Sequence, residues 1–297
     1  MAGMQAGLTG NSAVAYAMKQ VDPDVCAAYP ITPSTQILEE FSNYVADGKV
    51  GTGLITAESE HSAMSACIGA AAAGARVMTA TSSQGLALMW EMLYIASGLR
   101  LPVVIANVNR ALSAPINIHC DHSDTMGARD SGWVQLYSET VQEAYDNIFQ
   151  AVRIAEDERV QIPVMVCLDG FITSHAIENI TLLEDSQVKS FIREYSPKHS
   201  LLDVRRPATY GAMTLQDTYI IFKKQQSEAI ARAKDVVAEV GGEFEKLSGR
   251  PYGLMETYRL GDAEVAVVVL SSAAGTTKVA IDELRERGKK VGLLRPR

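Results

Sequence analysis

The chain has 297 residues, of which 47% are hydrophobic, and a formal net charge of −8. This length can bury a substantial core and suggests one large domain with a smaller addition. The negative charge, without any Lys/Arg-rich run, excludes an electrostatic surface for nucleic acid. No apolar run reaches the roughly 18 residues that span a bilayer, and the first residues lack a signal-peptide pattern, so we expect no membrane partner and a cytoplasmic location.

The chain alternates β-rich runs with helical patterns, which predicts an α/β fold with a doubly wound, mostly parallel sheet. The predicted elements, in chain order, are helix 11–20, strand 25–29, helix 34–46, strand 53–56, helix 60–74, strand 76–80, helix 84–97, strand 102–108, helix 139–158 and strand 163–168. A loop of about 24 residues, 109–132, interrupts the alternation, and loops of that length inside a domain are usually functional or disordered.

The C-terminal part has a different pattern. Residues 178–215 show strand-like pieces with weak periodicity, and 220–246 reads as one long amphipathic helix. Residues 262–297 read as strand, small-residue turn, helix and strand, which makes one right-handed βαβ unit. We therefore expect a first domain over 1–247, a linker over 248–261, and the start of a second α/β domain. A lone βαβ unit cannot bury both faces of its sheet, so we expect that a longer chain or a partner completes it.

The cysteines of the chain are far apart, at Cys26, Cys67, Cys120 and Cys167. They include no Cys-x-x-Cys pair, the spacing typical of iron–sulfur, zinc and dithiol redox sites. Three of them lie in apolar stretches, where free cysteine usually fills a core. If the protein takes part in electron transfer, we expect the clusters on another chain.

Potential metal ligands gather in residues 119–124 (His-Cys-Asp-His-Ser-Asp). They lie in a predicted loop rather than on one helix face, where an i, i+4 spacing would direct two histidines to the same ion. We favour a hydrogen-bonded structural loop and expect no metal site in this chain.

Residues 29–35 (Tyr-Pro-Ile-Thr-Pro-Ser-Thr) follow a predicted strand and open a helix. Open α/β sheets bind ligands at such strand ends, and the free N–H groups of a helix start attract anions. The alternative is purely local, with Thr32 as N-cap and Pro33 in the first helical turn. Local sequence does not decide between the two.

Glu58 and Glu60 also stand where a strand meets a helix. Two residues apart on a helix, they point in different directions and cannot form a paired-carboxylate site. Acidic residues are common in the first turn of a helix because they complement its dipole, and that reading competes with a functional one.

Short motifs with characteristic order and spacing, together with the closing βαβ unit at 262–297, cover nearly the whole chain. They are 10–15 (GNSAVA), 29–35 (YPITPST), 58–61 (ESEH), 81–86 (TSSQGL), 109–115 (NRALSAP), 121–124 (DHSD), 129–133 (RDSGW), 142–145 (QEAY) and 169–171 (DGF). Together they resemble the α subunit, or N-terminal domain, of the 2-oxoacid:ferredoxin oxidoreductases. The combination of 109–111, 121–124 and 129–133 looks most like the pyruvate branch of that family.

The resemblance implies thiamine diphosphate bound between two domains, one holding the diphosphate and metal and the other facing the aminopyrimidine. The diphosphate half usually carries a Gly-Asp-Gly sequence followed by a metal-binding Asn, whereas here Gly261-Asp262 is followed by Ala263. The resemblance therefore implies that this chain is the pyrimidine-side half, and that residues 262–297 begin a domain similar to the transketolase C-terminal domain.

The family's Ser-Glu pair falls on Glu60, not Glu58, so the resemblance gives Glu60 the catalytic role of a carboxylate that binds the pyrimidine nitrogen N1′ and activates the cofactor. It places Tyr29, Pro30 and Ile31 against the cofactor as well. The chemistry itself is the cofactor's, and the protein contributes orientation and electrostatics.

The resemblance assigns the substrate carboxylate to Arg110, assisted by the hydroxyl of Thr32. A planar guanidinium suits this task because it meets two carboxylate oxygens at once. Without the family, an Arg at the start of a loop is more often simply solvated.

The implied function is thiamine-dependent oxidative decarboxylation of pyruvate to acetyl-CoA and CO2, with electrons passed to ferredoxin, or the reverse. The enzyme would be active only with partner subunits: a β subunit carrying the diphosphate, Mg and a [4Fe–4S] cluster, and γ and δ subunits. Coenzyme A would be the co-substrate. Two alternatives stay open: a different acid (2-oxoglutarate, a branched 2-oxoacid or oxalate), or a noncatalytic assembly subunit.

Overall fold

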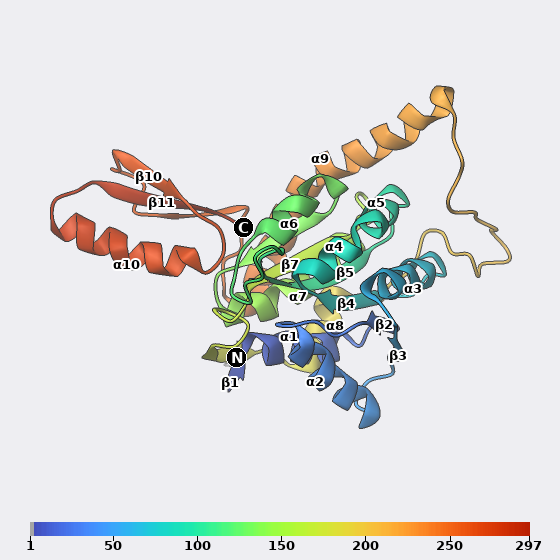
Figure 1. Cartoon of the computed structure of the whole chain (residues 1–297), viewed down its shortest axis with the longest axis horizontal. Helices are drawn as coiled ribbons and strands as arrows, with labels where there is room; N and C mark the ends of the chain where they lie inside the picture. The colour runs from blue at the N-terminus through green and yellow to red at the C-terminus, as the bar shows by residue number, and fades with distance from the viewer. Residues whose placement is uncertain (1–2) are drawn as a thin grey trace.

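The computed structural model describes residues 3–297 and places a six-stranded parallel sheet at the centre of the first part of the chain (Figure 1). The strand order is β3-β2-β4-β5-β7-β6. The strands are β2 (Val25–Ala28), β3 (Gly53–Thr56), β4 (Val77–Thr81), β5 (Val103–Asn109), β6 (Val134–Ser138) and β7 (Val164–Asp169). The expected α/β fold with a parallel sheet is confirmed.

Helices cover both faces of this sheet. The helices on one face are α1 (Gly10–Val21), α2 (Thr35–Ala46) and α7 (Val141–Ala155), and those on the other are α3 (Glu60–Ala72), α4 (Ser83–Leu88) and α5 (Trp90–Gly98). Successive strand side chains point to opposite faces, so Val104 and Ala106 join the α1–α7 core while Val103 and Ile105 join the α3–α5 core. A strand buried on both faces explains the continuous apolar runs in the sequence.

Several elements lie outside the central sheet. They are β1 (Met4–Thr9), β8 (Ile177–Leu182), α8 (Asp185–Ile192) and α9 (Gln216–Ser248). The strands β1 and β8 pair antiparallel with each other, and α9 confirms the predicted long helix, with its first turns projecting beyond the sheet domain in Figure 1. Among residues 3–297, no helix is both long enough and apolar enough to cross a membrane.

The predicted βαβ unit is present as β10 (Val265–Val268), α10 (Ala273–Glu286) and β11 (Val291–Pro296), with its two strands parallel. Within the segment expected to be a linker, β9 (Met255–Tyr258) adds an antiparallel strand to β11. Figure 1 shows this unit set to one side of the sheet domain. The unit has a small hydrophobic core of its own. The proposed domain limits at 247 and 262 stay a prediction.

Charged groups join this unit to the sheet domain. The guanidinium of Arg295 is almost completely buried and pairs with Glu143 at 2.7 Å and with Glu139 at 3.2 Å. The hydroxyl of Ser271 donates to the carbonyl of Ser138, at the end of β6, at 2.7 Å. The unit is therefore fixed against the carboxyl-terminal edge of the sheet, where several functional candidates also lie.

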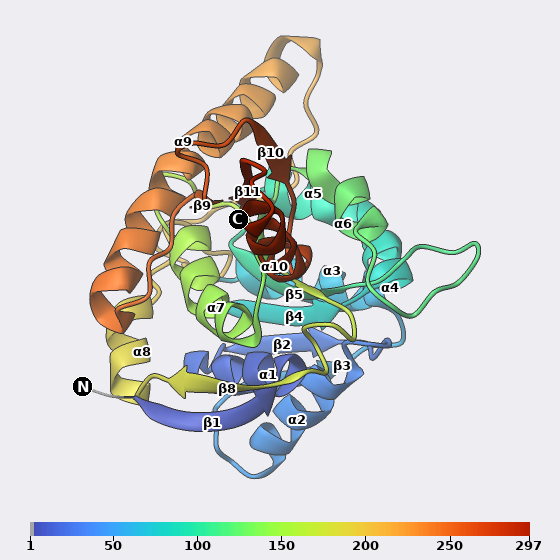
Figure 2. The ribbon, with the colours of Figure 1, turned by 90° about the vertical axis from the view of Figure 1, so that its left-hand side faces the viewer.

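The segment 109–132 was wrongly predicted to be one loop. It contains α6 (Ser123–Ala128) and a 3-10 turn (Arg129–Ser131), and only the part before α6 extends away from the sheet (Figure 2). The predicted helix 84–97 is in fact α4 and α5, which meet at Met89. A six-residue helix has little local signal, because tertiary contacts hold it in place.

Candidate cofactor and substrate site

The candidate residues follow the carboxyl ends of neighbouring strands. Residues 29–32 follow β2, Glu60 follows β3, Ser83 and Gln84 follow β4, and Arg110 follows β5. The chain runs from β2 outward to β3 and from β4 in the other direction to β5, so the strand order reverses between β2 and β4. Open α/β sheets bind ligands in the crevice at such a reversal.

Burial separates the two carboxylates that the sequence left side by side. Glu58 is exposed and accepts a hydrogen bond from Ser62 Oγ at 2.6 Å. Glu60 is 6% exposed, and its carboxylate makes no hydrogen bond or ion pair within residues 3–297. It stands in the first turn of α3, after the N-cap Ser59, where the helix dipole favours a negative charge. A largely buried carboxylate that no protein group contacts is available to accept a hydrogen bond from a ligand.

Gly85 packs against this carboxylate at a place where no side chain fits. A Cβ atom at that position would lie 2.8 Å from Glu60 Oε1 and closer still to the hydroxyl of Thr81. The Thr81 hydroxyl is itself buried without a hydrogen-bond partner. A free carboxylate and a free hydroxyl therefore flank a site where a side chain is excluded.

Arg110 is a buried cation whose side chain has no carboxylate partner within the described residues. Its Nη1 donates to the Thr32 carbonyl at 2.6 Å, and its Nη2 donates to Gln84 Oε1. Burial lowers the pKa of the guanidinium, and the nearby charge of Asp124 partly opposes this shift. The two oxygens that accept hydrogen bonds from the guanidinium are neutral. The positive charge of Arg110 is therefore available to an anionic ligand.

Gln84 and Gly85 connect the two charged groups. Gln84 contacts the Arg110 guanidinium, and its own amide nitrogen donates to Ser113 Oγ at 2.8 Å, while Gly85 adjoins Glu60. The turn before them depends on Ser83, whose φ of 46° is unusual for a residue with a side chain. Backbone strain of this kind is commonly found at functional sites.

The segment after β2 lies at the same edge. Tyr29 and Pro30 are exposed and Ile31 is partly exposed, so all three are accessible for a contact with a ligand or another chain. The Thr32 side chain is exposed, and its carbonyl is the group that holds Arg110. The local alternative with Thr32 as N-cap was wrong, because α2 starts at Thr35 and residue 34 precedes it as N-cap.

Asp124 is a site residue whose role sequence reasoning missed. Its buried carboxylate accepts hydrogen bonds from Asn109 Nδ2 at 2.9 Å and from the backbone N–H groups of Ser83 and Arg110 at 3.1 and 3.2 Å. The available signal was its membership of the 119–124 cluster, which we interpreted as a hydrogen-bonded structural loop without assigning a role to Asp124. Its partners lie 14 to 41 residues away, so local spacing does not reveal them.

Two other residues of that cluster, Cys120 and His122, lie beside Asp169 at the junction with the C-terminal unit. His122 Nε2 and Asp169 Oδ1 are 2.8 Å apart, and Asp169 also accepts a hydrogen bond from Ser272 N at 3.0 Å. Burial favours a higher pKa for Asp169, but its hydrogen bonds with His122 and Ser272 bring the net pKa below its usual value, and the same contact raises the pKa of His122. Cys120 lies beside them, so these ligand atoms already contact one another as a hydrogen-bonded cluster.

The remaining cysteines lie in the two hydrophobic cores. Cys26, Cys67 and Cys167 are fully buried, as expected for three of the four. Burial raises the pKa of the Cys67 thiol to about 12, which keeps it protonated and inert.

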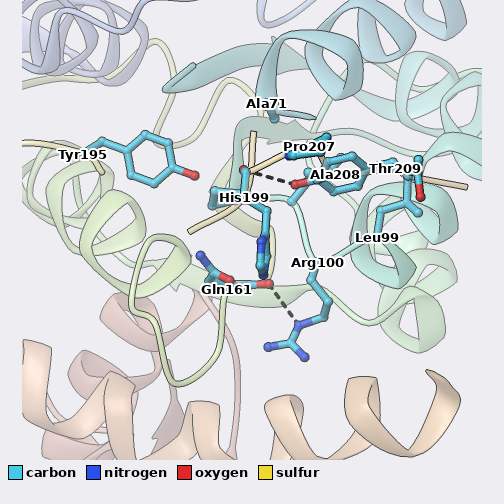
Figure 3. Close-up of a pocket in the computed structure, with 12 residues that line it drawn as sticks. Ala71, Leu99, Arg100, Gln161, Tyr195, His199, Pro207, Ala208 and Thr209 are labelled. Carbon is cyan, nitrogen blue, oxygen red and sulfur yellow. Dashed lines mark hydrogen bonds between the residues drawn. The ribbon is translucent and has the colours of Figure 1, made fainter. Parts of the chain in front are cut away.

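A cavity of about 390 Å³ lies at the opposite, amino-terminal edge of the sheet (Figure 3). Residues 195–210 pass over it, and Arg100 lies at its border, where its Nε donates to the Gln161 carbonyl at 3.1 Å. Burial and the charge of Arg232 lower the pKa of Arg100. The guanidinium donates hydrogen bonds to carbonyl groups of the turn before β7. Arg100 therefore has a structural role away from the candidate site.

Comparison with known proteins identifies the family. The family model described as pyruvate flavodoxin/ferredoxin oxidoreductase, thiamine diP-binding, matches residues 16–241, and that of pyruvate:ferredoxin oxidoreductase core domain II matches residues 263–297. The chain belongs to this family. Pyruvate synthase subunit PorA of Thermotoga maritima is 57% identical over 97% of this chain and 74% of that protein. The PorA subunit of Methanocaldococcus jannaschii is 54% identical over 98% of this chain and 75% of that protein.

Two further relatives differ in the acid that they are named for. Ketoisovalerate oxidoreductase subunit VorA of Pyrococcus horikoshii is 43% identical over 98% of this chain and 73% of that protein. The structure of a 2-oxoglutarate:ferredoxin oxidoreductase from Magnetococcus marinus matches with a TM-score of 0.80 at 22% identity, over 98% of this chain and 53% of that chain. This chain thus spans about half of that structure's chain, and the likeness shows a shared fold.

Exchanging Gly85 for alanine tests whether cofactor binding depends on the position of the Glu60 carboxylate. In the assembled complex, Gly85→Ala should weaken binding of thiamine diphosphate by about tenfold or more. The new methyl group would displace the Glu60 carboxylate, and the hydrogen bond expected between that carboxylate and the cofactor is worth roughly 1.5–3 kcal/mol. Isothermal titration with the cofactor measures this. Gly69→Ala is the matched control, since a Cβ on that helical glycine would meet nothing within 4 Å. Equal affinities for the two variants would contradict the site.

Proposed function

We propose that this chain supplies the pyrimidine-facing half of a thiamine diphosphate site in a multi-subunit pyruvate:ferredoxin oxidoreductase. The observation that carries the proposal is the pair of buried, unpaired charges, Glu60 and Arg110, at one edge of the sheet and connected by residues 84–85. The family membership and the PorA relatives support it. The reaction is oxidation of pyruvate to acetyl-CoA and CO2 with electrons passed to ferredoxin, or its reverse.

The residues present fit an aminopyrimidine. A ring nitrogen hydrogen-bonded to Glu60 would complete the free carboxylate, and the bare backbone at Gly85 allows a planar ring to come close. Thiamine diphosphate, when bound, supplies the carbanion chemistry that lets CO2 leave the substrate. Glu60 holds a negative charge at the ring and so favours a proton on that nitrogen. Tyr29, Pro30 and Ile31 offer further surface to the cofactor.

Arg110 binds the substrate carboxylate in this proposal. Two neutral acceptors, the Thr32 carbonyl and Gln84, hold the guanidinium in place and leave its charge for the ligand. The exposed hydroxyl of Thr32 is adjacent and can donate a second hydrogen bond. Apart from the buried carboxylate of Asp124, the groups around Arg110 are neutral. A single cation in such surroundings suits a small monoanion such as pyruvate. A dianion such as 2-oxoglutarate would require a second cation.

The two alternatives, a different 2-oxoacid and a noncatalytic assembly subunit, have less support than pyruvate oxidation. Arg129 was the candidate for a second cation, but its side chain is 68% exposed and lies 3.7 Å from Asp130. The names of two similar proteins include ketoisovalerate and 2-oxoglutarate. A substrate screen should therefore include branched and dianionic 2-oxoacids, and oxalate as well. A noncatalytic assembly role would not require a buried carboxylate and a buried guanidinium that have no oppositely charged side chain as a partner.

Partner chains complete the site. Leu88, Trp90 and Tyr94 expose apolar surface on α4 and α5, the helices that lead away from Gln84, and such a surface suits a protein contact. We place the diphosphate, Mg and a [4Fe–4S] cluster on a β subunit, because the described cysteines of this chain lie mainly in its cores. We further propose γ and δ subunits, ferredoxin as electron acceptor and coenzyme A as co-substrate. A cytoplasmic location stays a prediction.

Replacing Glu60 by glutamine tests the cofactor role. In the assembled complex, Glu60→Gln should lower 2-oxoacid-dependent reduction of ferredoxin or a viologen by at least about 100-fold, because a neutral amide no longer favours a protonated ring nitrogen. Glu58→Gln is the matched control, since that carboxylate is exposed and contacts Ser62 only through a local hydrogen bond. Size-exclusion chromatography checks that both complexes assemble. Near-normal turnover of Glu60→Gln would refute the assignment.

Replacing Arg110 by alanine tests the substrate role. Arg110→Ala should raise KM for pyruvate by about tenfold or more, because it removes a charge-assisted contact of roughly 1.5–3 kcal/mol from a buried site. Arg129→Ala, on the exposed neighbouring turn, should leave KM for pyruvate unchanged. Steady-state kinetics with pyruvate and with 2-oxoglutarate measure both variants. If only Arg129→Ala changed KM, and did so for 2-oxoglutarate, the dianionic alternative would replace our proposal.

A further inference from the structure

We propose that Asp124 is a positioning residue that fixes the substrate-binding Arg110 relative to the cofactor-binding Glu60. This inference rests on the proposed function of those two residues. Asp124 itself is 2% exposed and lies beneath the site, so it acts through the groups that it holds.

The carboxylate of Asp124 is saturated with N–H donors from three elements. Its Oδ2 accepts from Ser83 N at 3.1 Å, Arg110 N at 3.2 Å and Asn107 Nδ2 at 3.2 Å. Its Oδ1 accepts from Asn109 Nδ2 at 2.9 Å and from the N–H of the following residue, 125, at 2.7 Å. The donors belong to the start of α4, the end of β5 and α6, which converge on this one side chain.

Two of these donors, the backbone N–H groups of Ser83 and Arg110, are directly joined to groups of the proposed site. On the β4 side, the Ser83 N–H is held in a turn with φ of 46°, and the two residues after it place an amide on Arg110 and a bare backbone beside Glu60. On the β5 side, the bonded N–H belongs to Arg110 itself. The same carboxylate therefore fixes both strand ends, and the distance between the two charged groups depends on it.

Only a carboxylate satisfies this arrangement. Both oxygens must accept, because every neighbouring group in the set is an N–H donor. An asparagine would direct an NH2 group against these donors and lose at least two of the five hydrogen bonds. Asp124 makes no ion pair with the described residues, so its role is hydrogen bonding to backbone and amide groups rather than charge pairing.

A general effect on stability is the competing explanation, and the chain offers a matched control. Asp146 is also fully buried and hydrogen-bonded, with Arg250 Nε at 2.6 Å and Tyr252 Oη at 2.5 Å. It lies on α7, at the junction with the segment that leads to the C-terminal unit. Loss of Asp146 should therefore cost stability without moving the two charged groups of the site.

The test compares Asp124→Asn and Asp146→Asn in the assembled complex. Both should lower the unfolding temperature, but only Asp124→Asn should raise KM for pyruvate by about tenfold or more and also lower kcat, since small displacements of aligned groups cost up to about 100-fold in rate. Equal kinetic effects for the two variants, or an unchanged KM in Asp124→Asn, would overturn the proposal. Should Asp124→Asn not assemble, Asn109→Ala removes one donor from the same carboxylate, and an unchanged KM there would overturn it too.

A double-mutant cycle shows whether Asp124 acts through Arg110. In an Arg110→Ala background, Asp124→Asn should cause no further rise in KM, whereas independent effects would multiply. The parent variants separate this inference from the proposed function. If Arg110→Ala and Glu60→Gln behave as expected and the cycle shows multiplication, the positioning role fails alone. If Arg110→Ala leaves KM unchanged and Glu60→Gln leaves turnover unchanged, the proposed function itself is contradicted.

Discussion

The site depends on the burial of two opposite charges that do not neutralise each other. Taking an ion out of water is costly, and folded proteins usually compensate it with a partner. Glu60 has no hydrogen-bond partner, and Arg110 contacts only neutral oxygens, within the part of the chain that the structure describes. Both lie at the carboxyl-terminal edge of one sheet, Glu60 in the first turn of α3 and Arg110 directly after β5. A bound cofactor and a bound acid would complete them.

The surroundings are organised to keep these charges apart and fixed. Asp124 accepts hydrogen bonds from the residues that follow β4 and β5, Gln84 contacts the guanidinium, and Gly85 lets the Glu60 carboxylate lie against the backbone. The C-terminal unit contacts the same edge through hydrogen bonds at Asp169. A mutation of Asp124 would therefore act through the geometry of residues 83–85 and Arg110 rather than through contact with a ligand.

Much of the fold could be predicted from the sequence, because the alternation of apolar strands and helices is a local pattern. The strands β1, β6 and β8 were missed or left vague, since each pairs with a segment distant in the chain or, for β6, with a later strand. Glu60 was distinguishable from Glu58 only through the family motif until burial separated them. Asp124 and Gln84 stand in motifs that the sequence shows, but their roles could not be predicted because they arise from contacts 14 to 41 residues away.

The central claim is that this chain holds one half of a cofactor site. Isothermal titration of thiamine diphosphate and Mg into the purified chain alone, and into the chain co-purified with its partner, tests that claim most directly. The account predicts saturable binding by the complex and none by the isolated chain, because Glu60 contacts only the pyrimidine end of the cofactor. Binding of equal affinity by the isolated chain would contradict it.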